Sequence, residues 1–234
     1  MPQFEYQLLR TSKISSGLRL SIHPEKGVIV RAPFWVPETL VRKFVEAKSA
    51  WVEKHLKKLQ ARTAPAKQYL AGEKHLYFGQ EYLLTITEAS APQRTTAQIS
   101  ADQLQVTLFD GHTGAQRINE IQDAILRLYL ETGIAVITEK VNHFTTQLGV
   151  EYSRIDIKKV SSIWGSCSPS NRLCFNRKLI MAPPEVVEYV VIHEVCHLVQ
   201  RNHSSRFWAL VARFDPEFRE HRRWLHRHHL LLSL

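Results

Sequence analysis

The chain has 234 residues, which is enough for one large domain or two small ones, and its 44% hydrophobic and 23% charged residues are typical of a globular protein. It contains no run of about eighteen apolar residues, which excludes a membrane-spanning helix, and no signal-peptide pattern, so we expect a cytoplasmic protein. The formal net charge of +9 favours an anionic partner such as nucleic acid, a nucleotide or an acidic protein. Three cysteines, Cys167, Cys174 and Cys196, are too few for a disulfide framework.

The first third of the chain predicts a small sheet followed by one long helix. Residues 5–10, 18–23 and 27–33 form short β-rich segments separated by Ser-Gly and Glu-Lys-Gly turns, which favours a β-meander. Residues 38–62 carry apolar side chains every three or four positions without glycine or proline, so we expect a single amphipathic helix there. Residues 74–109 return to strand character and predict more antiparallel sheet.

The stretch "DGHTG", residues 110–114, is the clearest break in composition, and we place a domain boundary there. The expected domains are residues 1–112, rich in β-structure with one long helix, and residues 113–234. The second domain should begin with a helix over about 115–148 and continue with a strand, a loop at "SSIWGSCSPSN", a strand at "RLCFNRKLI" and three helices. This order predicts an α+β fold.

Capping residues divide the C-terminal part into its three helices. The first should begin at the prolines at positions 183 and 184 and end near Asn202, a residue that suits a left-handed C-terminal position. One of the serines at 204 and 205 should start a short second helix, and Asp215 should cap the third.

Histidines at metal-ligand spacing interrupt the first of these helices, in "VIHEVCHLVQRNHSSRFW". Because a helix advances about 100° per residue, His193 and His197 lie about 40° apart around the axis and can reach one ion. Glu194 lies close enough to act on a water without competing for the metal. Catalytic zinc sites use this arrangement, in which one coordination position stays open for water and a carboxylate takes the water's proton.

A catalytic zinc needs a third protein ligand, and His203 is the first candidate. On an unbroken helix His203 would lie about 240° from His197, so it can ligate only if the helix ends and the chain turns back. Metzincin peptidases share the spacing HExxHxxxxxH but make their turn with a glycine where this chain has Gln200. The alternative ligands are Glu217 and Glu220 from the last helix. His193, Glu194 and His197 are polar residues in an otherwise apolar helix, and each would cost several kcal/mol if it were buried without a partner. A bound metal ion would satisfy all three, so we expect one zinc ion per chain.

The stretches "HEVCHLVQRNHSSRFW" and "WGSCSPSNRLCFNRKLIMAPPEVVEYVVIHE" resemble the YgjP-like metallopeptidases, a family related to the WLM and SprT-like zinc proteases. Weaker resemblance extends to "VRAPFWVP" and "WVEKHLKK". The resemblance implies a zincin-like catalytic domain in which a short sheet packs on the motif helix. It also implies zinc bound by His193, His197 and His203 with Glu194 as general base, and a cleft lined by Trp164, Gly165, Ser166 and the strand from about residue 172 to 179.

Peptide hydrolysis is the leading functional hypothesis. An exposed edge strand at "RLCFNRKL" could hold an extended peptide by backbone pairing. Tyr189, Arg206 and His221 are candidates for stabilising the oxyanion.

Two other activities remain open. The first is hydrolysis of a phosphoanhydride, as in a nucleoside triphosphate pyrophosphatase, with Arg172, Arg177, Lys178 and Arg206 near the cleft to neutralise phosphates. No phosphate-cradling glycine loop accompanies these residues. The second is a DNA-associated SprT-like protease that localises through "EHRRWLHRHH" and Trp224, although an amphipathic C-terminal helix with a solvated basic face is the favoured explanation of that segment.

Overall fold

The computed structural model describes residues 4–12, 17–23, 26–60, 67–89, 94–109, 111, 113–160 and 163–232. Over these residues the chain has the expected α+β fold, with three small sheets and six α-helices. It divides into two compact units, Met1–Pro65 and Ala66–Leu234, which we describe separately. Among the described helices none combines the length and apolar character needed to cross a membrane.

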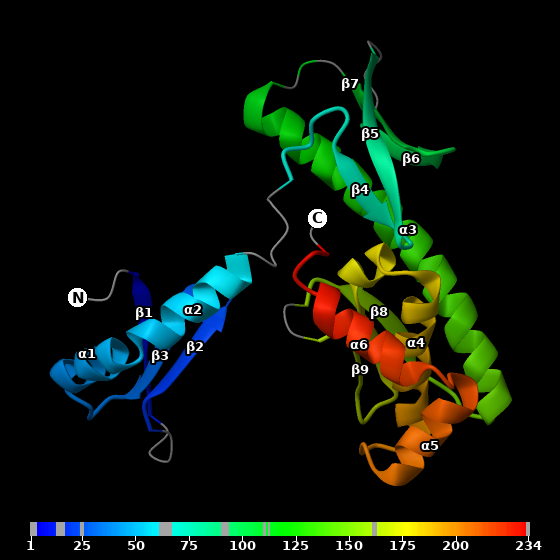
Figure 1. Cartoon of the computed structure of the whole chain (residues 1–234). Helices are drawn as coiled ribbons and strands as arrows, with labels where there is room; N and C mark the ends of the chain where they lie inside the picture. The colour runs from blue at the N-terminus through cyan, green and yellow to red at the C-terminus, as the bar shows by residue number, and fades with distance from the viewer. Residues whose placement is uncertain are drawn as a thin grey trace. The chain divides into compact units, whose positions relative to one another are not determined.

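The first unit has a three-stranded sheet with β3 (Gly27–Pro33) in the centre. β3 pairs antiparallel with β2 (Arg19–His23) and parallel with β1 (Tyr6–Thr11). The predicted meander is therefore wrong, because β1 pairs with β3 and not with its neighbour in sequence. Two helices, α1 (Glu38–Ala47) and α2 (Ser49–Gln60), follow the sheet (Figure 1).

Two helices replace the single one expected over residues 38–62. The chain leaves the helical conformation at Lys48, where φ is −102° and ψ is 2°. Ser49 Oγ donates a hydrogen bond of 2.8 Å to the carbonyl of Glu46, which satisfies an acceptor at the end of α1. Val41 and Val45 of α1 are fully buried against the sheet residues Val30 and Ala32.

The second unit begins with a four-stranded sheet that packs on a long helix. The strands are β4 (Lys74–Tyr77), β5 (Gln80–Ala89), β6 (Thr96–Ser100) and β7 (Gln103–Phe109), in the order β4-β5-β7-β6. β5 and β7 are parallel, so the sheet is mixed and not antiparallel as predicted. The alternate residues Leu104, Val106 and Leu108 of β7 are buried in the same cluster as Ile121 and Ile125 of α3 (Gly114–Leu148).

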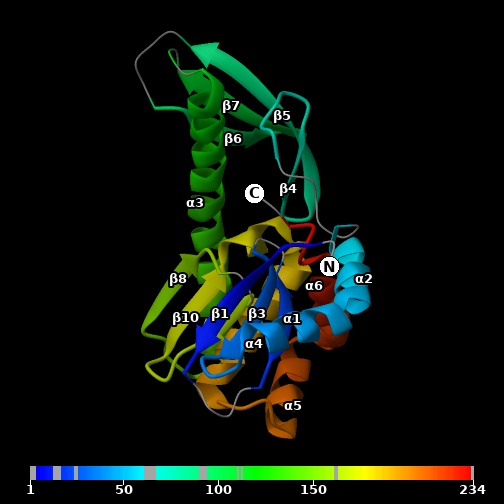
Figure 2. The same cartoon turned by 90° about the vertical axis from the view of Figure 1, so that its left-hand side faces the viewer.

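This packing explains where the two units divide. The sheet shares its hydrophobic core with α3, so it belongs to the second unit. The division therefore falls between Pro65 and Ala66, whereas the sequence placed it between residues 112 and 113. In Figures 1 and 2 the sheet lies beside the N-terminal part of α3, and the remaining elements of the unit lie beside its C-terminal part.

These remaining elements are a second mixed sheet, a short 3₁₀-helix and three α-helices. The sheet has the order β8-β10-β9 and consists of β8 (Arg154–Lys158), β9 (Gly165–Cys167) and β10 (Arg172–Asn176). β9 falls in the stretch expected to be a loop. β10 is the central strand, so the predicted edge strand at "RLCFNRKL" is wrong: β10 pairs with β8 on one side and β9 on the other, and the chain then enters η1 (Arg177–Met181).

The helices are α4 (Pro184–Val199), α5 (Ser205–Phe214) and α6 (Phe218–His228). Asp215 follows α5, and its carboxylate accepts hydrogen bonds from the backbone N–H of Glu217 and from Nδ1 of His221. Asp215 therefore holds the turn before α6, although the N-cap position itself is occupied by Glu217.

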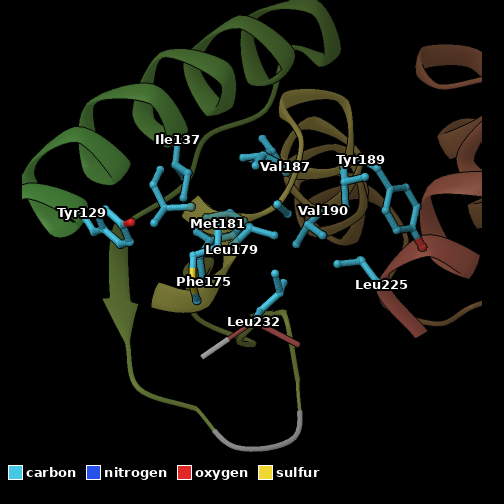
Figure 3. Close-up of a cluster of buried hydrophobic side chains, with 14 of the residues drawn as sticks. Tyr129, Ile137, Phe175, Leu179, Met181, Val187, Tyr189, Val190, Leu225 and Leu232 are labelled. Atoms are coloured by element: carbon cyan, nitrogen blue, oxygen red, sulfur yellow. The ribbon is translucent and has the colours of Figure 1, made fainter. Parts of the chain in front are cut away.

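α4 is buried on several sides, which fixes the position of the side chains it carries. Val187 of α4 lies near Ile137 of α3, while Tyr189 extends away from α3 (Figure 3). Phe175, Leu179 and Met181 fill the space beside them and are 0 to 2% exposed. A helix enclosed in this way is a rigid base for a site.

The turn between β4 and β5 docks just ahead of α4. The backbone N–H of Phe78 donates to the carbonyl of Ile180 (2.7 Å) and that of Gly79 to the carbonyl of Met181 (3.2 Å). Gly79 has φ +76°, and a Cβ there would lie 2.8 Å from Cα of Pro183. Only glycine fits both the conformation and the close approach, so this turn holds the beginning of α4 in place.

Candidate metal centre

Three histidines meet at the C-terminal end of α4. His193 and His197 lie one turn apart on α4, and His203 lies in the segment between α4 and α5. Their potential ligand nitrogens all lie within 4.8 Å of one another, and Nε2 of His193 is 3.1 Å from Nε2 of His203. In the described part of the chain no other set of histidine, cysteine, aspartate or glutamate side chains is grouped in this way.

A break in the helix delivers His203 to the other two histidines. α4 ends at Val199 because Gln200 is extended, with φ −124° and ψ 103°, and α5 begins two residues after His203. The left-handed stop predicted at Asn202 is wrong, since the extended residue Gln200 ends the helix and Asn202 does not have a positive φ. Asn202 instead accepts a hydrogen bond from the backbone N–H of Ser204, the N-cap residue of α5.

Phe207 supports all three imidazoles. Its ring is fully buried, and its centroid lies 4.4 Å from that of His197, against which it stacks, and 4.9 Å from those of His193 and His203. Trp208 stacks on the outer side of His203 at 5.6 Å. The "SRFW" stretch thus packs under the histidines, a role that the sequence analysis missed although Phe207 lies four residues after His203.

Hydrogen bonding and burial prepare the histidines to bind a cation. Nδ1 of His197 is 2.9 Å from the carbonyl of Gln200, so it donates its proton there and leaves Nε2 with a free lone pair. Burial, with smaller contributions from the neighbouring imidazoles, lowers the pKa of His193 to about 3. Burial also lowers the pKa of His197. Both rings are therefore neutral near pH 7, which is the state that binds a metal ion.

Glu194 is a buried carboxylate beside the histidines. It is 4% exposed, burial raises its pKa to about 8, and its Oε2 accepts no hydrogen bond from the described residues. Gly165 of β9 lies against it: a Cβ at position 165 would be 2.6 Å from Cγ and from Oε1 of Glu194. An unpaired buried carboxylate is costly unless it serves a bound group, so we regard Glu194 as part of the site.

Asn176, another residue missed by the sequence analysis, holds β9 near Glu194. Its side-chain amide donates to the carbonyls of Val160 (2.8 Å) and Ile163 (2.9 Å), and its backbone N–H donates to the carbonyl of Trp164 (2.8 Å). Asn176 is 5% exposed and sits at the end of the central strand β10. An asparagine in "CFNRK" carries no sequence signal for this role, because its partners lie 12 to 16 residues away.

The histidines and Glu194 line a cavity of about 590 Å³. Trp164, Gly165 and Ser166 lie in its wall, in the position that the family resemblance implied. Cys167, Tyr189, Arg201 and Arg222 also line it. The cavity is bounded by β9, α4, the segment after α4, and α6, so it is large enough and varied enough to admit a side chain of a substrate.

Three predicted arginines are not among the residues that line this cavity. Arg172 faces Asp156, with Nε 3.9 Å from Oδ2, while Arg177 is half-buried at the start of η1. Arg206 is exposed on α5.

The alternative metal ligands and two of the oxyanion candidates are also placed. Glu220 forms a salt bridge with Arg223, and neither Glu220 nor Glu217 joins the histidine group. Tyr189 lines the cavity, and burial raises its pKa to about 12, so its hydroxyl remains a proton donor at neutral pH. His221 is bound to Asp215 at 2.8 Å and is not part of the cavity wall.

Comparison with known families agrees with this geometry. The sequence model described as YgjP-like, metallopeptidase domain, matches residues 16–228. The chain belongs to the YgjP-like metallopeptidase family. The predicted family is thereby confirmed, and with it a metal-dependent hydrolase of the peptidase type.

Among solved structures, this YgjP-like chain is similar to two metallopeptidase zymogens, abylysin of Pyrococcus abyssi and jannalysin of Methanocaldococcus jannaschii. Each is 23% identical, with a TM-score of 0.35 and a match that covers 38% of this chain and 92% of the other. No curated protein matches the chain significantly.

Proposed function

We propose that the protein is a zinc-dependent peptidase in which His193, His197 and His203 hold one zinc ion and Glu194 is the general base. The observation that carries this proposal is the convergence of three imidazoles beside an unpaired buried carboxylate in one cavity. Zinc–nitrogen bonds of about 2.0–2.1 Å in a tetrahedral site place neighbouring nitrogens about 3.3 Å apart. The 3.1 Å between Nε2 of His193 and Nε2 of His203 fits that spacing.

Zinc, when bound, supplies Lewis-acid polarisation of the scissile carbonyl and acidifies water. Glu194 then takes a proton from the attacking water and returns it to the leaving amine. A carboxyl group whose pKa lies near neutrality can do both, and burial raises the pKa of Glu194 to about 8 before any cation is present. A divalent cation at the three histidines would lower this pKa from about 8, so that Glu194 is ionised and can accept a proton at neutral pH.

The edge strand β9 is the surface that suits an extended peptide. β9 pairs with β10 on one side only, and its residues Gly165, Ser166 and Cys167 all line the cavity. A peptide that adds to the free edge of β9 would be held by backbone hydrogen bonds next to Glu194 and the histidines. β9 therefore replaces the strand at "RLCFNRKL" as the proposed site of pairing.

Tyr189 is the oxyanion candidate that the geometry favours. It lies one turn before His193 on α4 and lines the cavity, and its ring centroid is 6.0 Å from that of His193. Its high pKa keeps the hydroxyl protonated, which allows it to donate a hydrogen bond to a developing negative charge.

Hydrolysis of a nucleoside triphosphate finds less support. It relied on Arg172, Arg177, Lys178 and Arg206 near the metal, and none of the four lines the cavity. A phosphate chain needs several cations aimed at one point. Among the described cavity residues only Arg201 and Arg222 are basic besides histidine, and Arg201 is already bonded to the carbonyl of Ser168 and to Asn171.

The proposal is tested by Glu194→Gln in zinc-loaded protein, with an unstructured polypeptide such as casein as substrate. Loss of the general base should lower kcat by a factor of about 10²–10⁴ while the zinc content stays unchanged. His143→Ala is the matched control, because His143 is exposed on α3 away from the cavity. If Glu194→Gln cleaves the substrate as fast as the wild-type protein, the assigned mechanism is incorrect.

A further inference from the structure

A second cavity, of about 560 Å³, adjoins the metal-site cavity, and we call it the basic cavity. It is lined by Trp208, Phe218, Arg219, Arg222, Arg223, His226 and Arg227. The two cavities share two wall residues, Arg222 and His226. The two cavities therefore adjoin at these two side chains of α6.

The basic residues of this cavity form one face of α6. They occupy positions i, i+3, i+4, i+7 and i+8 of the helix, which are neighbours on one side of it. The apolar residues Phe218 and Leu225 of α6 are buried in the core. Like charges at this spacing destabilise a helix, so a face with four arginines and one histidine is costly unless an anionic partner offsets the repulsion.

Several of these cations have no acidic partner within the described chain. Arg223 is bound to Glu220 in a two-pronged contact of 2.6 and 2.7 Å. Arg219 and Arg222 lie over the rings of Phe218 and Trp208, and neither they nor Arg227 form a salt bridge with any described carboxylate. Glu194 is the one acidic side chain among the described residues that line the two cavities.

The aromatic residues argue for a peptide and against a nucleic acid as the ligand. Single-stranded nucleic acids are held by aromatic rings on which bases stack. The rings of Trp208 and Phe218 already stack on each other at 5.3 Å, and Trp208 also stacks on His203. Trp224 lines neither cavity and stacks on His228 at 4.3 Å. The described wall of the basic cavity thus offers positive charge, while its two aromatic rings already stack on each other.

We infer that the basic cavity binds acidic side chains of the polypeptide substrate, so that the enzyme prefers aspartate and glutamate close to the bond it cleaves. This inference rests on the proposed peptidase function. The ring of Trp208, in the wall of the basic cavity, is 5.6 Å from the ring of His203. An extended peptide advances about 3.3 Å per residue, so the wall of the basic cavity at Trp208 is about two residues along a peptide from His203.

The test compares a labelled, unstructured peptide rich in glutamate with the same peptide carrying glutamine at each of those positions. Binding is measured by fluorescence anisotropy on zinc-loaded Glu194→Gln protein at low salt, and cleavage is measured with the wild-type enzyme. The double variant Arg219→Gln/Arg227→Gln removes two cations of the basic cavity. Arg206→Gln/Arg213→Gln removes the same charge from exposed positions on α5 that line neither cavity.

The glutamate peptide should bind about tenfold more tightly than the glutamine peptide, and this preference should disappear in Arg219→Gln/Arg227→Gln and persist in the α5 variant. Added salt should weaken the preference, since the contacts are exposed. Equal binding of the two peptides, or equal losses in both double variants, would overturn the inference. A labelled oligothymidylate that binds more tightly than the glutamate peptide and depends on Arg219 and Arg227 would overturn it in favour of nucleic acid.

Failure of the proposed function gives a different pattern. If the zinc-loaded wild-type enzyme cleaves neither peptide but the binding preference holds, the acidic-ligand site stands and the peptidase activity does not. If the wild-type enzyme cleaves both peptides at the same rate without a binding preference, the peptidase activity stands and the basic cavity has no part in specificity.

Discussion

Gly165 and Glu194 lie so close that position 165 has no room for a side chain. A Cβ added to Gly165 would be 2.6 Å from both Cγ and Oε1 of Glu194 and 2.8 Å from its Cδ. Strand β9 therefore forms a wall against the carboxylate, and the backbone of Gly165 determines where Glu194 can point. The "WGSC" stretch thus contributes to the site because its glycine, Gly165, leaves room for the side chain of Glu194.

Gly165→Ala tests this relationship. The added methyl group must displace the carboxylate of Glu194, and a general base misplaced by about 1 Å can cost about a hundredfold in kcat. We expect that loss in a peptidase assay with zinc content unchanged, since the three atoms nearest to the added Cβ all belong to Glu194. Gly17→Ala is the control, because no atom lies within 4 Å of the Cβ it would add. A kcat equal to that of the wild-type enzyme would show that Glu194 moves aside without consequence.

Phe207 is expected to contribute to metal affinity as well as to stability. Phe207→Leu keeps an apolar side chain but removes the ring that touches all three imidazoles. We expect zinc affinity to fall by about tenfold, the lower end of what is lost when residues that orient ligands are changed. Competition with a chromophoric chelator measures this affinity.

The matched control for Phe207 is Phe214→Leu on the same helix. Phe214 packs against Phe144 of α3 at 5.7 Å, and among the described residues its ring does not contact the three histidines. Phe214 is half-buried, so Phe214→Leu should lower the free energy of unfolding, although by less than Phe207→Leu, without lowering zinc affinity. Parallel losses of affinity in both variants would mean that Phe207 acts only through stability.

The grouping of the three histidines was largely predictable from sequence because these residues are close together along the chain. The apolar run from Val186 to Val199, the histidine spacing and the polar break at Gln200 all reflect local helix geometry. Phe207 and Asn176 were not predicted, since their roles depend on contacts that form only when distant segments meet.

Strand pairing was the least predictable part of the fold. β1 and β3 each have ordinary strand sequences, but their parallel pairing skips the intervening strand β2. β10 was expected at an edge, but it lies in the centre of its sheet between β8 and β9. The prediction was wrong because β9 is only three residues long and has no alternation of apolar and polar residues that would identify it as a strand. Partner choice in a sheet depends on non-local contacts, whereas the helix of residues 114–148 follows from local periodicity alone.

His75 should make the stability of the protein sensitive to acid. It is 2% exposed on β4, and its pKa is lowered from 6.5 to about 4, mainly by burial and also by the nearby Lys67, while Glu73 opposes the shift. Between these two values the unfolded chain binds a proton that the folded chain does not, so the free energy of unfolding decreases as the pH falls from 6.5 toward 4. The slope is at most about 1.4 kcal/mol per pH unit for one group.

Urea unfolding of metal-free protein across this pH range measures the effect. His75→Leu should show a shallower dependence than the wild-type protein, while His143→Leu, at an exposed position, should show none of this change. His193 also has a lowered pKa, so it too makes the free energy of unfolding decrease as the pH falls. Because all three proteins contain His193, its contribution cancels when their pH dependences are compared. Identical pH dependence in wild-type and His75→Leu protein would mean that His75 does not titrate as its burial implies.

Zinc content measured by mass spectrometry after purification without chelators tests whether the three histidines hold a zinc ion. We expect about one zinc ion per chain in the wild-type protein and in His143→Ala, and a clear loss of bound zinc in His203→Ala, because three protein ligands are needed to hold a catalytic ion. Full zinc occupancy in His203→Ala, together with its loss in Glu217→Ala or Glu220→Ala, would contradict the three-histidine site.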